Sequence, residues 1–159
     1  MNVLKRTTFI VADADAAARF HETVFGWQRW YDKRLTADRR FPPTGSGEDA
    51  AVRLVILETS DPVIGKLGFL QYLEDPFGGQ AATGPSDRVR PGEPVLVVAT
   101  KDVDGVHARA RAAGATIVTP PVDWTVPGPA EQPPIRLRSL SFFDPSGIYF
   151  EVSAHPDTD

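Results

Sequence analysis

The chain has 159 residues, no cysteine and a formal net charge of −4. The length is that of about one domain, and the lack of cysteine excludes disulfide frameworks, thiolate nucleophiles and cysteine-ligated metal or iron–sulfur sites. The mildly acidic composition provides no basic surface for a nucleic acid, and no apolar run is long enough for a signal sequence or a membrane span, so we expect a cytoplasmic protein.

The first half of the chain carries the signals of four strands and one helix. The strand-like runs are rich in apolar and β-branched residues and cover 7–11, 27–31, 51–59 and 67–75. An Ala-rich stretch between the first two runs predicts the helix. Asp13 or Asp15 can accept hydrogen bonds from its first amides, and Gly26 suits the left-handed position after its last turn. The order is βαβββ.

The second half repeats this order, which indicates an internal duplication. Its strand-like runs cover 95–100, 115–119, 135–143 and 148–152. Asp102 and Asp104 precede a second Ala-rich helix, and Gly114 follows it. The segment from Asp144 to Gly147 reads DPSG, and it predicts a tight turn because proline favours the second turn position and glycine the fourth.

We therefore predict one α+β domain built from two βαβββ modules. Module one covers about 5–75 and module two about 94–154, with a Pro- and Gly-rich linker over about 76–93. The segments 36–50 and 120–134 are expected to be long loops. Loops of this length in a compact domain are typically functional lids or lack order.

Two segments resemble a known family. VADADAAARFHETVFGW at the first helix and FFDPSGIYFEV at the last hairpin resemble signatures of the vicinal-oxygen-chelate, or glyoxalase/bleomycin resistance protein/dioxygenase, superfamily. The two segments and the duplication between them cover nearly the whole chain. The resemblance implies concave sheets, a cleft for a small molecule and a homodimer. It leaves the chemistry open, because relatives range from glyoxalase I and extradiol dioxygenases to metal-free drug-binding resistance proteins.

The resemblance also implies four metal-ligand positions, on the first and last strand of each module. Here they fall on Arg6, Val95, Glu151 and, within GFLQYLED, on Gln71 or, as a second choice, Glu74. Arginine has no lone pair to give and valine cannot ligate, so at most two oxygen ligands remain. A catalytic metal usually has about three protein ligands. We expect no metal cofactor, and a divalent ion is the open alternative.

The three histidines do not restore the metal site. His21 and His107 lie on the two predicted helices, where a surface histidine usually has no special role, and His155 lies past the last strand. Dioxygenase and glyoxalase chemistry are both disfavoured by this placement.

Strand alternation predicts the face that would hold a ligand, because residues two apart share a side. This face is mostly apolar, with one cation, one anion and one amide. The predicted ligand-binding residues, which include Trp124 as a lid in the second long loop, are Arg6, Thr8, Phe69, Gln71, Val95, Val97, Trp124, Tyr149 and Glu151. Arg6 can pair with Glu151 or bind an anionic group in a fork, or it can equally lie in solvent at the start of its strand.

The sequence thus predicts a small-molecule-binding protein of the glyoxalase/bleomycin-resistance type, without a complete metal site and without a nucleic-acid or membrane partner. One alternative is an enzyme, either a lyase, isomerase or dioxygenase-like enzyme using a divalent ion through Gln71, Glu74 and Glu151, or one using Arg6 and Glu151 for acid–base work. Another is a structural or regulatory module whose own side chains fill the cleft.

Overall fold

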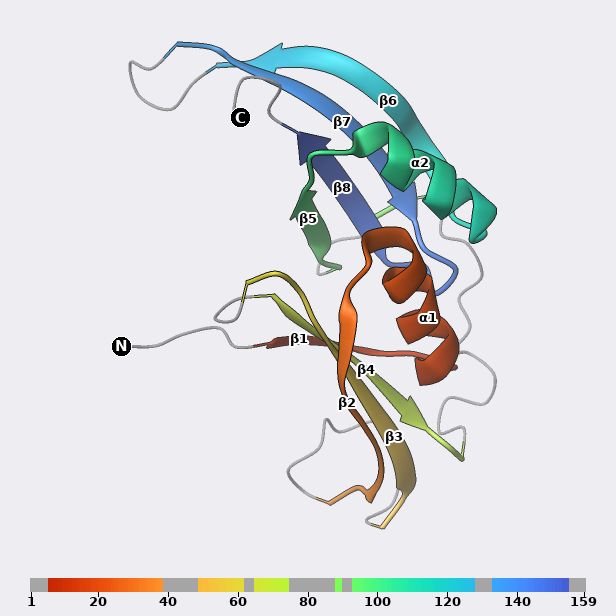
Figure 1. Ribbon diagram of the computed structural model, residues 1–159. Helices are drawn as coiled ribbons and strands as arrows, with labels where there is room; N and C mark the ends of the chain where they lie inside the picture. Colours follow the sequence, from red (N-terminus) through yellow and green to blue (C-terminus); the bar gives the residue numbers. More distant parts are fainter. Residues whose placement is uncertain are drawn as a thin grey trace. The chain divides into compact units, whose positions relative to one another are not determined.

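The computed structural model describes residues 6–38, 49–61, 65–74, 88–89, 93–127 and 133–154. The chain divides into two compact units, Met1–Thr83 and Gly84–Asp159 (Figure 1). In its described residues each unit contains one helix and one four-stranded mixed sheet, so the predicted α+β fold of two βαβββ modules is confirmed. No helix of the described residues is long and apolar enough to cross a membrane.

Several predicted features lie wholly or largely outside the described residues. They are His155, most of the linker over 76–93 and the middle of the segment 36–50.

The first unit has its helix between its first two strands. Its elements are β1 (Arg6–Ile10), α1 (Ala14–Phe25), β2 (Gln28–Thr36), β3 (Ala51–Glu58) and β4 (Lys66–Tyr72). The strands lie in the order β1-β4-β3-β2, with β1 parallel to β4 and the other neighbours antiparallel. Among the described residues the helix α1 packs on one face of this sheet. We call the opposite face, on which Val52, Ile56 and Leu70 are buried, the helix-free face.

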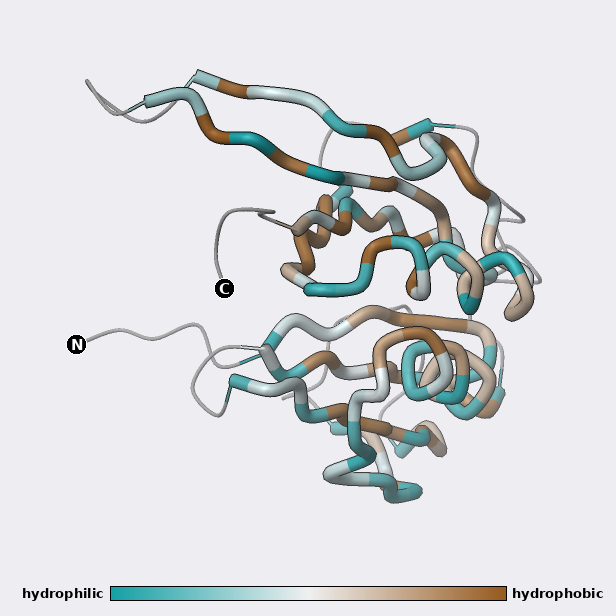
Figure 2. Tube along the Cα trace, turned by 45° about the horizontal axis from the view of Figure 1, so that its top comes forward, coloured by the Kyte–Doolittle hydropathy of each residue, from teal (hydrophilic) through white to brown (hydrophobic). Residues whose placement is uncertain are grey.

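The second unit has the same topology. Its elements are β5 (Val95–Ala99), α2 (Val103–Ala112), β6 (Thr116–Val126), β7 (Ile135–Phe143) and β8 (Tyr149–Ala154). The strand order is β5-β8-β7-β6, with β5 parallel to β8. Hydrophobic and hydrophilic positions alternate along the β6–β7 hairpin (Figure 2), as expected when the two faces of a sheet differ.

The predicted caps and turn are confirmed. The Oδ1 atom of Asp13 accepts from two amides of the first turn of α1, at 2.9 Å each, and Gly26 follows α1 with φ of 72°. In the second unit Asp102 caps α2 by accepting from the amide of Gly105 at 2.9 Å. The DPSG turn closes on Asp144, whose Oδ1 accepts from two backbone amides, at 2.9 and 2.8 Å.

The loop predicted over 120–134 is in part wrong. Residues 120–126 continue β6, and Trp124 stands opposite Leu137 in the β6–β7 register. Pro120 and Pro121 fall at a shift of register between Thr119 and Val122. Proline cannot donate to a sheet ladder but is tolerated at a bulge, so this pair kinks the strand without ending it.

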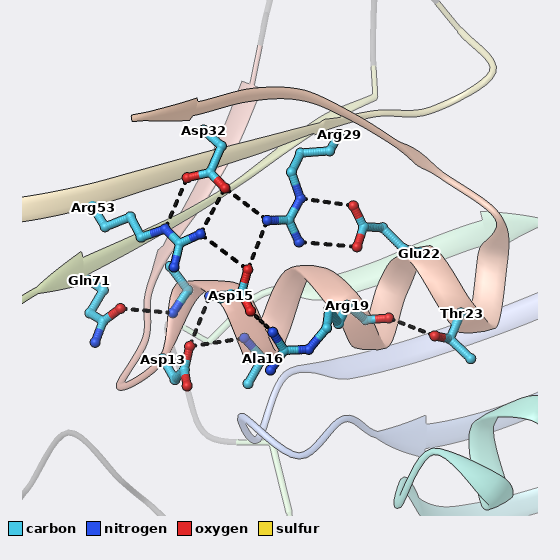
Figure 3. Close-up of polar contacts among 11 residues, drawn as sticks. Asp13, Asp15, Ala16, Arg19, Glu22, Thr23, Arg29, Asp32, Arg53 and Gln71 are labelled. Carbon is cyan, nitrogen blue, oxygen red and sulfur yellow. Dashed lines mark hydrogen bonds and ion pairs between the residues drawn. The ribbon is translucent and has the colours of Figure 1, made fainter. Parts of the chain in front are cut away.

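An ion network ties α1 to its sheet (Figure 3). Oδ1 of Asp15 on α1 accepts from Nη1 of Arg29 at 2.8 Å and from Nη2 of Arg53 at 3.1 Å. Arg29 also holds Glu22 through two bonds of 2.9 and 3.1 Å. Asp32 accepts from both arginines, with Arg53 bound in a fork at 2.9 and 2.8 Å. These hydrogen bonds, those from Arg53 first, lower the pKa of Asp32 to about 2.

The second unit contains a counterpart of this network. Arg138 on β7 binds Asp104 of α2 in a fork at 3.0 and 2.8 Å, and its remaining amino group binds Asp123 of β6 at 3.0 Å. Arg53 and Arg138 thus have the same structural role, since each joins the start of a helix to a neighbouring strand. We call the two arrangements the arginine clamps.

His21 lies in the core between α1 and the first sheet, and its expected surface position is wrong. The ring is fully buried, stacks on Phe69 with centroids 5.0 Å apart, and has Nδ1 2.8 Å from the carbonyl oxygen of Ala17. Burial lowers the pKa of His21 to about 4, against the effect of its hydrogen bond to Ala17. This histidine is therefore a neutral core residue near pH 7.

The arginine clamp of the first unit predicts a contribution to the free energy of unfolding that is lost in acid. Because the pKa of Asp32 falls from its usual 3.8 to about 2 in the folded unit, the contribution is present above pH 4 and is lost as the pH falls from about 4 to about 2. We expect Asp32→Asn to lower the free energy of unfolding at pH 7 by about 1–2 kcal/mol, and by little at pH 2. Urea titrations at both pH values measure the difference.

Asp123→Asn is the matched control for that substitution. Asp123 holds the equivalent place in the second clamp, but its side chain is 75% exposed, against 27% for Asp32. Solvent screens an exposed pair, so the loss should be much smaller. Equal losses for the two variants at pH 7 would contradict the assignment.

Candidate functional site

The helix-free face of the second sheet is hollowed. The hollow has a volume of about 470 Å³, within the usual range for small-molecule sites. It is lined from all four strands by Val97, Thr119, Val122, Trp124, Leu137, Ser139, Leu140, Ser141, Tyr149, Glu151, Val152 and Ser153. Every one of these residues belongs to the second unit.

Two aromatic side chains and one carboxylate give the hollow its chemical character. The indole Nε1 of Trp124 donates to Oγ of Ser139 at 2.9 Å, which fixes the ring on the strand pair β6–β7. Tyr149 packs on Phe143, with ring centroids 5.0 Å apart. Glu151 is the one acidic or basic side chain among the lining residues. The site therefore offers flat apolar walls, several hydroxyl groups and a single negative charge.

Four predicted ligand-binding residues meet in this hollow. Val97, Trp124, Tyr149 and Glu151 all line it, and Val97 and Trp124 are 70% and 50% exposed. Val95 stands opposite Tyr149 in the β5–β8 register and shares their side of the sheet, although it does not line the hollow. Trp124 lines the hollow as a strand residue and not as a lid in a loop.

In the first unit the structure separates the predicted residues. Arg6 and Thr8 lie on the helix-free face, as predicted, beside Gly68 of β4. Phe69 and Gln71 lie on the opposite face, so their predicted side is wrong. Phe69 stacks on His21 of α1, as described above, and Oε1 of Gln71 accepts from the first amide of α1 at 3.3 Å.

Sequence reasoning missed the hydroxyl groups of β6 and β7 that line the hollow. Ser139 and Ser141 stand opposite Ser153 and Glu151 in the β7–β8 register, and Thr119 stands opposite Ser141. Directly opposed residues in antiparallel strands share a face, so counting outward from Glu151 across the predicted hairpin would have identified both serines. The bulge in β6 shifts the pairing between β6 and β7, so the same counting would not have identified Thr119.

Comparisons with known proteins agree with this architecture. A family model described as "Glyoxalase/Bleomycin resistance protein/Dioxygenase superfamily" matches residues 3–152. A comparison with curated proteins finds no match.

Solved structures share the fold over nearly the full chain. A glyoxalase family protein from Bacillus cereus is 18% identical, with a TM-score of 0.71, and the match covers 97% of this chain and 94% of that one. A glyoxalase/bleomycin resistance protein/dioxygenase family enzyme from Burkholderia phytofirmans is 17% identical, with a TM-score of 0.58 over 97% and 99% of the two chains. Identities this low show the fold alone.

The side chains at the family's ligand positions do not fit a divalent-ion centre. Arg6 and Val95 have no lone pair to offer. Gln71 lies on the helix side of its sheet, where its oxygen is bonded to α1, and Glu74 follows β4. Glu151 is left as a single carboxylate, and no three His, Asp or Glu side chains of the described residues come together as ligands.

This donor set predicts that the chain does not retain a tightly bound metal. Protein purified without added metal should contain far less than one nickel, zinc, manganese or iron ion per chain by elemental mass analysis. Adding each ion should leave the melting temperature unchanged. About one tightly held ion per chain would overturn the prediction and would favour the metal-dependent enzyme.

Proposed function

Because the chain belongs to the glyoxalase/bleomycin resistance protein/dioxygenase superfamily, we propose that it binds a small organic molecule in the hollow of the second sheet without a metal ion. The observation that supports this function is the hollow itself, which joins exposed apolar and aromatic side chains to one carboxylate. Ligand sites are typically apolar cavities with a few polar groups that orient the ligand.

The chemistry of the hollow favours a flat ring with a hydrogen-bond donor or a positive charge. Trp124 and Tyr149 present aromatic surface on which a ring can stack. Glu151 accepts hydrogen bonds only, and it would pair with an ammonium or an N–H group of the ligand. The serine hydroxyls, which both donate and accept, add orientation without setting the sign of the charge.

The unfilled volume of the hollow counts against a purely structural module. Such a module would fill its cleft with its own side chains, whereas here about 470 Å³ is open. The alternative of a metal-dependent enzyme is disfavoured, because the described residues provide no set of metal ligands.

Two naphthalene probes of equal size test this function. We expect 2-naphthylmethylamine, which is cationic at pH 7, to bind more tightly than neutral 2-naphthylmethanol, because only the amine pairs with Glu151. Calorimetry gives the two affinities, and a shift of the Trp124 indole N–H resonance places both probes in the hollow. Trp124→Ala should weaken both probes at least tenfold.

Substitution of the carboxylate separates charge from shape. Glu151→Gln should remove the preference for the amine and leave the affinity for the alcohol unchanged. Asp123→Asn is the control, because Asp123 stands next to Trp124 on β6 but binds Arg138 on the helix side. Failure of both probes to shift the Trp124 resonance would contradict the proposal.

We also propose that the chain is a homodimer in the cytoplasm, as the family resemblance implies. Two exposed apolar side chains of the second sheet that do not line the hollow, Val95 and Val118, support association, since monomers rarely expose large apolar patches. Light scattering after size exclusion should give about twice the 17.3 kDa of the chain. A single-chain mass at micromolar concentration would contradict the dimer.

A further inference from the structure

Ser141 presents a buried hydroxyl group to the hollow of the second sheet. The residue lies on β7, lines the hollow and is 6% exposed. Its hydroxyl group has no hydrogen-bond partner in the part of the chain that the structure describes, whereas the hydroxyl group of Ser139 accepts from Trp124. Buried polar side chains in folded proteins are nearly always hydrogen-bonded. The molecule that fills the hollow is therefore expected to supply the partner of this hydroxyl group.

The pairing of the strands places Ser141 beside the carboxylate of the hollow. Ser141 stands directly opposite Glu151 of β8 in the β7–β8 register. Directly opposed residues share a face of the sheet and have Cβ atoms about 5 Å apart. No hydrogen bond joins the two side chains, and Glu151 forms no ion pair with a described residue. One small planar group of a ligand can therefore contact both side chains.

The two side chains differ in the hydrogen bonds that they can make. The carboxylate of Glu151 accepts hydrogen bonds only, whereas the hydroxyl group of Ser141 also donates one. A ligand with an N–H donor next to an acceptor atom is complementary to both. An ammonium group would pair with Glu151, but it would offer no acceptor to the proton of the Ser141 hydroxyl group.

Aromatic side chains flank this pair on both sides along the strands. Tyr149 lies two residues before Glu151 on β8, and residues two apart share a side of the sheet. On the other side, Trp124 is held against Ser139, which lies two residues before Ser141 on β7. A ring that stacks on either aromatic side chain thus brings its polar edge over Ser141 and Glu151.

We propose that Ser141 and Glu151 together recognise a planar group in which an N–H donor lies next to a carbonyl acceptor, as in a lactam or a primary amide on a flat ring. The N–H group donates to the carboxylate of Glu151, and the hydroxyl group of Ser141 donates to the carbonyl oxygen. This inference rests on the function proposed above, because it names the class of ligand for the same hollow. It goes further by assigning part of the selectivity to Ser141.

Two bicyclic lactams that differ by one methyl group test the donor. We expect 1-isoquinolone, which carries adjacent N–H and C=O groups, to bind at least tenfold more tightly than 2-methyl-1-isoquinolone, which has lost the N–H group and turns a methyl group toward Glu151. Calorimetry gives the two affinities, and a shift of the Trp124 indole N–H resonance places the probes in the hollow. Equal affinities of the two lactams would overturn the assignment.

Ser141→Ala tests the hydroxyl group. This substitution should weaken 1-isoquinolone at least fivefold, because the carbonyl oxygen loses its donor. It should leave the affinity for 2-naphthylmethylamine within twofold, because the amine pairs with Glu151, and this second result shows that the hollow of the variant is intact. Ser146→Ala is the matched control and should leave both affinities unchanged, because Ser146 lies outside the hollow and contributes to the DPSG turn through its backbone amide.

The outcomes separate this inference from the function on which it rests. If neither the amine nor the lactams shift the Trp124 resonance, the function proposed for the hollow is wrong, and the assignment of Ser141 fails with it. If the amine binds in the hollow but Ser141→Ala binds 1-isoquinolone as tightly as the unaltered protein, only the assignment of Ser141 is wrong. Equal weakening of both probes by Ser141→Ala would indicate a structural role and would also overturn it. A weakened lactam with an unchanged amine is the result expected when both proposals hold.

Discussion

The pairing of Asp15 with Arg29 and Arg53 determines which face of the first sheet packs against α1. Side chains alternate along a strand, so holding Arg53 on the helix side places its neighbours Val52 and Leu54 on the other face. A shift of one residue would break the fork to Asp32 and bury the arginine against the wrong surface. The clamp therefore stabilises the helix and also fixes which residues of β3 lie on each face of the sheet.

The second unit uses the same constraint to place its hollow. Arg138 binds Asp104 of α2, which turns its neighbours Leu137 and Ser139 to the helix-free face, where both line the hollow. Its carboxylate partners are more exposed than those of the first clamp, so the pairing there contributes less free energy while it imposes the same alternation. The two clamps therefore agree in geometry more closely than in the burial of their carboxylates.

Local signals allowed the elements to be predicted from the sequence, and non-local pairing explains the errors. Asp13, Gly26 and the DPSG turn interact only with residues close to them in the chain, so the sequence alone predicts them. The side on which Gln71 lies depends instead on pairing between β3 and β4, and an assignment borrowed from a family position put it on the wrong face. Trp124 was placed in a loop because two prolines precede it, although a bulge accommodates both and the strand continues.

The two helix-free faces differ in the charge that they leave uncompensated among the described residues. The first carries the cations Arg6 and Lys33 and the second the anion Glu151. Positions 6 and 151 are two of those that the family resemblance assigns to metal ligands. A Cβ atom on Gly68 of the adjacent strand would lie 3.2 Å from Cδ of Arg6, so the glycine leaves room for the stem of this arginine. Because Glu151 is exposed, solvent screens its charge, and a ligand of the hollow gains affinity from the aromatic walls as well as from pairing with the carboxylate.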